Sequence, residues 1–243
     1  VHRFYQEKNV GCDPSEYIAQ KWMFESEEMG IVIEDDDVPS QSFFPFCKEL
    51  LERYKDDLRI NMICGMNNTD VSKHCNDSYF FTNKGSICGW ASWRRVLDTW
   101  DPEYKFLDDP VTLKRLQDNS DSKEEYKKFI NTCIRHKASG RAHYESINGA
   151  ARRLYGRINI VPKYNMISNI GIDAVTTHGA NDIRKLPKRI QKIFFKKTYE
   201  IDFPLKHPQY VIRDKQFERE MTFTRKQNFF NKIEAGIRKI IYR

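Results

Sequence analysis

A β-branched run, Ile31-Val32-Ile33, ends in four consecutive acids at residues 34–37 and lies between two helical patterns. The pattern before it covers residues 14–28, and the pattern after it covers residues 41–55. A second apolar run follows at residues 60–64. Such alternation of strand and helix predicts an α/β fold, with a buried parallel strand at 31–33 and right-handed crossovers.

Later segments extend this pattern. The predicted elements are a short strand at 79–81, a polar helical insertion at 110–137, a helix at 143–155, a strand at 158–161, a loop at 165–171, and basic amphipathic helices at 183–197 and 225–241. The resulting organisation is an α/β body over residues 1–180 and a basic helical extension over residues 181–243.

The acids at residues 34–37 suggest a metal site, because ligands of α/β sheets bind at the carboxyl ends of strands. Carboxylate oxygens suit Mg²⁺ or Mn²⁺, which can bridge a protein to a diphosphate. In a turn, Asp35 and Asp36 point in different directions, so one can reach the metal while the other holds ribose or sugar hydroxyls. The alternative is a solvated loop, or an acidic cap at a helix N-terminus.

Three stretches together resemble one family: Gly30-Ile-Val-Ile-Glu-Asp-Asp-Asp-Val-Pro-Ser40, Gly89-Trp-Ala-Ser-Trp-Arg-Arg95 and Val161-Pro-Lys-Tyr-Asn-Met-Ile-Ser-Asn-Ile-Gly171. They are similar to motifs of the bacterial GT-A nucleotide-diphospho-sugar transferases often labelled hemolytic-protein-like. Thr177-His178 matches a fourth motif of that family, and the resemblance covers roughly residues 3–215. Cys88 stands where the family carries a further tryptophan.

The resemblance implies a Rossmann-like GT-A three-layer sandwich with a mixed sheet, followed here by the basic helices. It implies transfer of a sugar from a nucleoside-diphosphate donor, such as a UDP-sugar, to a glycan or lipid-linked acceptor. Inverting transfer in lipopolysaccharide or other surface polysaccharide assembly is the corresponding expectation. Family members begin with a strand and helix that cradle the base, and Val1 starts after that point, so we expect that part to be missing.

Residue by residue, the resemblance makes Asp36 a ligand of Mn²⁺ or Mg²⁺ and His178 a second ligand. It places Glu34 and Asp35 beside the donor. A catalytic base is implied at Glu145, at the start of the helix at 143–155, where it would accept the proton of the acceptor hydroxyl. Taken as bare residues, the alternatives are an ordinary loop histidine for His178 and a helix cap for Glu145.

The tryptophan motif would contact the donor sugar. Gly89 permits close approach, and the faces of Trp90 and Trp93 can stack on a pyranose ring. Arg94 could pair with diphosphate oxygens. The alternatives are a core cluster of tryptophans, with Trp93 the stronger core candidate, and a solvent-facing arginine.

The net charge of +7 is concentrated in residues 179–243, and the rest of the chain is net acidic. A basic end of this kind suggests a phosphate-bearing partner or peripheral contact with an anionic membrane, although packing on the body is the alternative. No apolar run approaches the roughly 20 residues of a membrane span. We expect a cytoplasmic protein at the inner face of the membrane.

The sequence carries no zinc-finger, RNA-recognition or helix-turn-helix signature, so nucleic acid is not the expected partner. The runner-up is a non-catalytic carbohydrate- or partner-binding domain of GT-A type.

Overall fold

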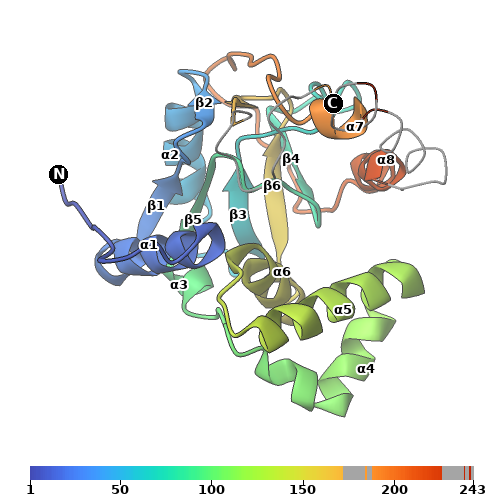
Figure 1. Cartoon of the computed structure of the whole chain (residues 1–243). Coiled ribbons are helices and arrows are strands. Elements are labelled where there is room, and N and C mark those ends of the chain that lie inside the picture. Colours follow the sequence, from blue (N-terminus) through green and yellow to red (C-terminus); the bar gives the residue numbers. More distant parts are fainter. Residues whose placement is uncertain (172–183, 185–187, 226–237, 239–240, 242–243) are drawn as a thin grey trace. The chain divides into compact units, whose positions relative to one another are not determined.

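The computed structural model describes residues 1–171, 184, 188–225, 238 and 241 (Figure 1). The chain folds into two compact units. The helical unit consists of Val1–Gly30 and Ser92–Arg157, and the sheet unit consists of Ile31–Ala91 and Ile158–Arg243. The boundary of the predicted basic extension, near residue 180, lies outside the described residues.

Five strands form a mixed sheet in the order β1-β5-β3-β6-β4. They are β1 (Met29–Val32), β3 (Ile60–Cys64), β4 (Tyr79–Thr82), β5 (Trp90–Trp93) and β6 (Ile158–Pro162). β3 and β6 run parallel, whereas β5 is antiparallel to β3 and β4 is antiparallel to β6. With helices flanking this sheet, the predicted α/β class and the mixed sheet are confirmed.

The centre of the sheet unit is β3, where every residue is buried. Helix α2 (Phe43–Arg53) packs on β3 through a face that includes Phe46 and Leu50, both 0% exposed. Burying each such side chain contributes about 1.5–3 kcal/mol to folding. The hydroxyl of Tyr54, directly after α2, forms a hydrogen bond of 2.6 Å with the hydroxyl of Tyr79, at the start of β4. The strand at 60–64 and the helix within 41–55 are therefore as predicted.

Strand β1 corrects one prediction. It lies at the edge of the sheet and all four of its residues are half-buried, so it is not the buried strand that its β-branched residues suggested. Gly30 lies inside β1 and does not terminate the preceding helix, α1 (Cys12–Ser26). A Cβ at Gly30 would lie 2.8 Å from the Met23 Cε atom, so Gly30 lets the Met23 side chain of α1 pack closely against this strand.

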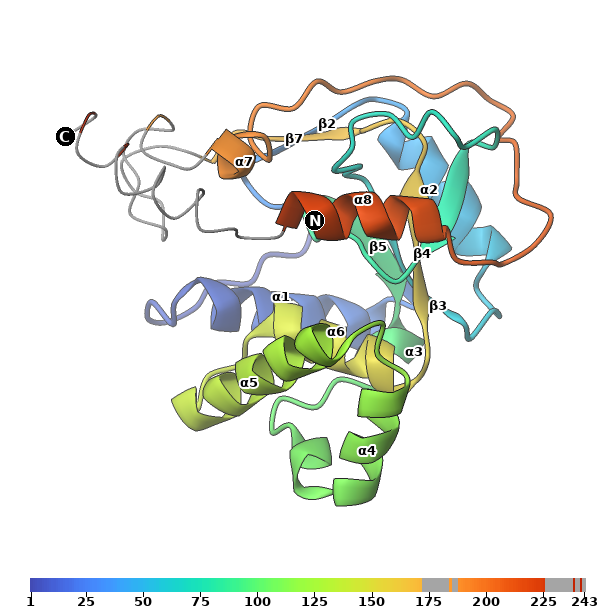
Figure 2. The same ribbon diagram turned by 90° about the vertical axis from the view of Figure 1, so that its right-hand side faces the viewer.

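A second sheet has two strands, β2 (Asp37–Pro39) and β7 (Ile167–Asn169), which lie side by side in Figure 2. They are antiparallel, with Asp37 opposite Asn169. The loop predicted at 165–171 is thus partly a strand. Three residues are too few to show an alternating pattern in sequence, and the backbone of β2 supplies the hydrogen-bonding partners.

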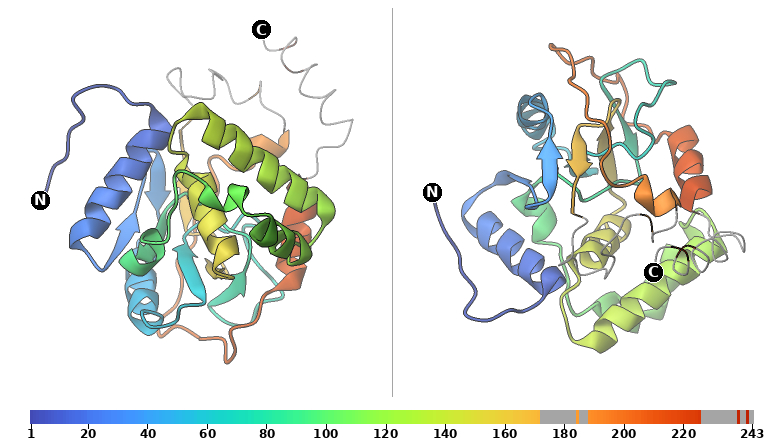
Figure 3. Two further views of the ribbon diagram at one scale, coloured as in Figure 1. Left: turned by 90° about the horizontal axis from the view of Figure 1, so that it is seen from below. Right: turned by 45° about the horizontal axis from the view of Figure 1, so that its top comes forward.

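The helical unit contains α1, α3 (Arg94–Leu97), α4 (Pro110–Asp118), α5 (Lys123–Ser139) and α6 (Tyr144–Leu154) (Figures 1 and 3). Helix α6 packs against α1 and α5. Asp13 accepts a hydrogen bond of 2.8 Å from the His143 ring at the start of α6. The predicted insertion at 110–137 is two helices, because the Ser122 hydroxyl caps α5 by accepting from the Glu125 N–H.

The predicted helix at 183–197 is only α7 (Lys188–Gln191) within the described residues. Residues 192–199 are not helical. Phe195 has φ +53, and its N–H donates to the Asn169 carbonyl at 2.9 Å. The Phe195 N–H thus bonds to the backbone of β7 rather than to a carbonyl four residues earlier, as it would in a helix. The predicted helix at 225–241 lies almost entirely outside the described residues.

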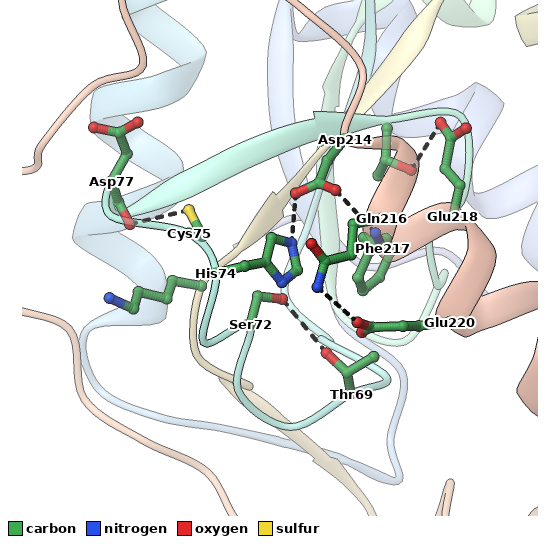
Figure 4. A network of polar contacts seen from close by, with 12 residues as sticks. Thr69, Ser72, His74, Cys75, Asp77, Asp214, Gln216, Phe217, Glu218 and Glu220 are labelled. Atoms are coloured by element: carbon green, nitrogen blue, oxygen red, sulfur yellow. Dashed lines mark hydrogen bonds and ion pairs between the residues drawn. The ribbon is translucent and has the colours of Figure 1, made fainter.

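Helix α8 (Lys215–Arg225) was not predicted, and it packs on β4. Asp214 caps it by accepting from the Phe217 N–H at 2.9 Å, and the same carboxylate binds the His74 ring at 2.7 Å (Figure 4). Glu218, only 4% exposed, accepts from Arg213 at 2.8 Å and from the Asn83 N–H at 2.9 Å. These polar contacts fasten α8 to the sheet unit. None of the described helices is long and apolar enough to cross a membrane.

Candidate functional site

The acids at residues 34–37, called the acidic turn below, connect β1 to β2 in the sheet unit. The Asp37 N–H donates to the Glu34 carbonyl at 3.1 Å, which closes the turn. Asp35 is exposed, Glu34 and Asp36 are half-buried, and Asp37 is only 7% exposed. The turn therefore gives its carboxylates different degrees of exposure.

Asp37 joins the acidic turn to the segment before β5. Its carboxylate accepts the Gly89 N–H at 2.7 Å and contacts the Asn169 amide at 3.4 Å. Burial raises the pKa of Asp37 to about 6, while hydrogen bonds from the Gly89 and Glu34 N–H groups partly offset that rise. Sequence reasoning gave Asp37 no role. The run of four acids does not show which of them is buried, because the Gly89 N–H that stabilises Asp37 is 52 residues away.

Asp36 is held by β7 and the residue that follows it. Its Oδ1 atom accepts from the Asn169 amide at 2.9 Å, and its backbone carbonyl accepts the Ile170 N–H at 2.8 Å. A Cβ at Gly171 would lie 1.8 Å from Oδ2 of Asp36, so this carboxylate needs glycine beside it. Burial, followed by the charge of Asp35, raises the pKa of Asp36.

Gly89 brings its backbone close to β7. It has φ +56, and a Cβ there would lie 2.5 Å from the Ile167 Cδ1 atom. A side chain is thus excluded both by backbone conformation and by space. The close approach predicted for Gly89 is made by protein rather than by a ligand, and it aims the Gly89 N–H at Asp37.

Trp90 is 1% exposed, so its ring cannot offer a face to a sugar in this conformation. Its indole N–H is buried, and no hydrogen-bond acceptor for it is present among the described residues. Such a group costs free energy unless a water or ligand satisfies it. Burial favours the core role that the sequence left open, and it leaves the indole N–H as the polar group that a ligand could use.

The remaining described candidates belong to the helical unit. Trp93 is 2% exposed, and the Arg95 guanidinium lies 4.4 Å from its ring centroid. Arg94 donates from Nε to the Phe24 carbonyl at 2.7 Å and caps the end of α1. Glu145 is exposed in the first turn of α6. Glu34, Asp35, Asp36, Gly89 and Trp90 thus belong to the sheet unit, in which Asp37 links the acidic turn to Gly89, whereas Trp93, Arg94 and Glu145 belong to the helical unit.

The fit to a divalent cation rests on Asp36. Ligand carboxylates are usually oriented by a second hydrogen bond, and the Asn169 amide makes such a bond to Asp36. The exposed Asp35 is its neighbour, and both supply the oxygen atoms that Mg²⁺ or Mn²⁺ prefers. Within the described residues no three His, Cys, Asp or Glu side chains form a metal-binding group. His178, the second predicted ligand, lies outside them.

No family model and no curated protein matches this sequence.

Proposed function

We propose that this chain is the catalytic part of a metal-dependent glycosyltransferase of GT-A type. It would move a sugar from a nucleoside-diphosphate sugar, such as a UDP-sugar, to a glycan or lipid-linked acceptor in surface polysaccharide assembly. One observation carries the proposal: the three stretches that resemble the family meet at the acidic turn. Asp37 binds the N–H of Gly89, 52 residues away, and Asp36 binds the amide of Asn169, 133 residues away.

Each residue of the acidic turn then has a separate task. Asp36, oriented by Asn169, would hold Mn²⁺ or Mg²⁺ together with His178. A bound cation neutralises charge that develops on the departing nucleoside diphosphate. The exposed Asp35, with Glu34 before it, can accept hydrogen bonds from ribose or sugar hydroxyls. The Trp90 indole N–H, which has no acceptor among the described residues, would donate to an oxygen of the bound ligand.

Glu145 is the proposed base for inverting transfer. Its position in the first turn of α6 leaves the carboxylate exposed, so an acceptor hydroxyl can reach it. Trp93 and Arg94 would support the site indirectly, since one is in the core and the other caps α1. Peripheral contact with an anionic membrane at the cytoplasmic face also remains a proposal, because the second predicted basic helix, at 225–241, lies almost entirely outside the described residues.

A donor-hydrolysis screen tests this function. Hydrolysis of UDP-sugars with Mn²⁺ would be compared for the wild type, Asp36→Ala and the control Asp56→Ala. Asp56 is exposed in the same unit, near the end of α2. Removing Asp36 should lower turnover by roughly 100-fold or more, and the control should match the wild type. Equal turnover in wild type and Asp36→Ala would remove the metal assignment.

A non-catalytic carbohydrate- or partner-binding domain is the second candidate. The observation in its favour is that no complete metal-binding group forms among the described residues. It predicts donor or glycan binding without turnover. Metal-dependent donor hydrolysis by the wild type separates the two functions. In a transferase, Glu145→Gln should then bind donor normally and transfer poorly, and unchanged transfer would make Glu145 a helix cap.

A further inference from the structure

Two tyrosines from distant parts of the sheet unit lie side by side. Tyr164 follows β6, and Tyr199 lies in the segment after α7. Their ring centroids are 6.0 Å apart, and the ring planes are inclined by 37°. Both side chains are half-buried, so each ring is supported by protein and still reaches solvent. Neither residue has a role in the acidic turn.

A buried asparagine fixes the pair. Asn165 is 0% exposed, and its backbone carbonyl accepts the Tyr199 N–H at 2.8 Å. Its side-chain amide donates to the Lys197 carbonyl at 2.9 Å, and its Oδ1 atom accepts the Asn67 N–H at 3.0 Å. The two tyrosine-bearing segments are therefore held together by hydrogen bonds of the Asn165 backbone and side chain, independently of contact between the rings.

A lysine ammonium group lies close to each ring. The Lys163 Nζ atom lies 5.4 Å from the Tyr164 centroid, and the Lys197 Nζ atom lies 4.8 Å from the Tyr199 centroid. In the part of the chain that the structure describes, neither ammonium group is within ion-pair distance of a carboxylate. Asp70, in the adjoining loop, is instead paired with Lys196. Each tyrosine ring thus lies close to a positive charge for which the described residues provide no ion-pair partner.

This lysine–tyrosine patch is connected to the acidic turn. The segment that carries Tyr199 runs beside β7, because the Phe195 N–H donates to the Asn169 carbonyl at 2.9 Å. Asn169 in turn holds the Asp36 carboxylate at 2.9 Å. Four residue steps separate Asn165 from Asn169, which corresponds to about 13 Å of extended chain. A sugar chain of a few units could span that distance.

We propose that Lys163, Tyr164, Lys197 and Tyr199 form a binding site for an acceptor saccharide that carries phosphate or carboxylate groups. The C–H face of a sugar ring packs on tyrosine, tyrosine hydroxyls bind sugar hydroxyls, and the ammonium groups pair with the anion. The role as acceptor rests on the proposed function. Single-stranded nucleic acid fits less well, because the acidic turn would repel a continuous phosphate backbone.

Saturation-transfer NMR tests the site without any need for turnover. The probes are trigalacturonate and the neutral trisaccharide maltotriose, with the Lys163→Ala/Lys197→Ala double variant and Tyr199→Ala. Matched controls are Lys48→Ala, at an exposed position of α2, and Tyr210→Ala, where the tyrosine is 64% exposed. We expect the double variant and Tyr199→Ala each to weaken trigalacturonate binding about tenfold, and the controls to leave it unchanged.

Two comparisons separate this site from the donor site. Trigalacturonate binding should persist in EDTA and in Asp36→Ala, since it uses no cation. If the wild type fails to bind donor but still binds trigalacturonate, the proposed function is contradicted and the saccharide site is not. Trigalacturonate binding that survives the double variant would overturn the site. Equal binding of maltotriose, or preferential binding of a single-stranded oligoribonucleotide through the same residues, would also overturn it.

Discussion

Gly171 determines where the Asp36 carboxylate can lie. A Cβ there would be 1.8 Å from Oδ2 of Asp36, so Gly171→Ala must displace the carboxylate without removing any charge. We predict that this variant folds but loses at least about tenfold in affinity for Mn²⁺ with UDP, measured by calorimetric titration. Gly149→Ala is the control, because its methyl group would meet only a flexible arginine end at 3.4 Å. Unchanged affinity in Gly171→Ala would mean that Asp36 does not hold the cation.

The indole N–H of Trp90 offers a second test at this scale. Because it is buried without an acceptor among the described residues, a bound donor that reaches it should shift its NMR signal. We predict that Mg²⁺ with UDP moves the Trp90 indole resonance, which is assigned from its loss in Trp90→Phe. Trp100 is the matched control, since its indole N–H is also buried without a described partner but belongs to the helical unit. A stationary Trp90 signal would remove it from the donor site.

At the scale of elements, α8 depends on a buried carboxylate. Burial alone would raise the pKa of Glu218, but hydrogen bonds from Arg213 and the Asn83 N–H hold it below its usual value. A carboxylate with a lowered folded pKa stabilises the fold above its unfolded pKa, and that stabilisation is lost as pH falls below it.

We therefore predict that Glu218→Gln lowers the free energy of unfolding by about 2–3 kcal/mol at pH 7, because Arg213 loses its charged partner. Urea denaturation between pH 7 and pH 3 would measure the difference from wild type, which should shrink as the pH drops below about 4.3. Glu220→Gln, at an exposed position of the same helix, should have little effect. A difference that is constant with pH would contradict this role for Glu218.

Elements with strong local patterns were predictable, and those defined by pairing were not. The apolar run at Ile60–Cys64 and the amphipathic α2 carry their burial in the sequence itself. β7 is defined by its partner β2, and α8 by contacts of Asp214 and Glu218 with distant segments. β1 reads as a buried strand from its branched residues, but its place at the sheet edge is set by the order of the strands.

For the molecule as a whole, the α/β class predicted from the sequence is confirmed, the metal chemistry of the acidic turn stays a prediction, and the geometry of that turn was not predicted. The family resemblance singles out Asp36, whereas the residues that position it, Asn169 and Gly171, lie in a segment that the sequence predicts only as a loop. The burial of Trp90 and Trp93 was left open, because a tryptophan-rich stretch can be a sugar platform or a core. The positioning of Asp36 depends on long-range hydrogen bonds and the burial of the tryptophans depends on packing, and neither can be inferred from single residues.

The measurement that bears most directly on the acidic turn is electron paramagnetic resonance of free Mn²⁺, titrated with protein in the presence and absence of UDP. If Asp36 holds a cation that also grips the diphosphate, UDP should tighten Mn²⁺ binding to the wild type about tenfold or more, and to the Asp56→Asn control equally. Asp36→Asn should abolish that enhancement. If UDP does not change the Mn²⁺ affinity of the wild type, or if it raises the affinity of Asp36→Asn by the same factor, the account is contradicted.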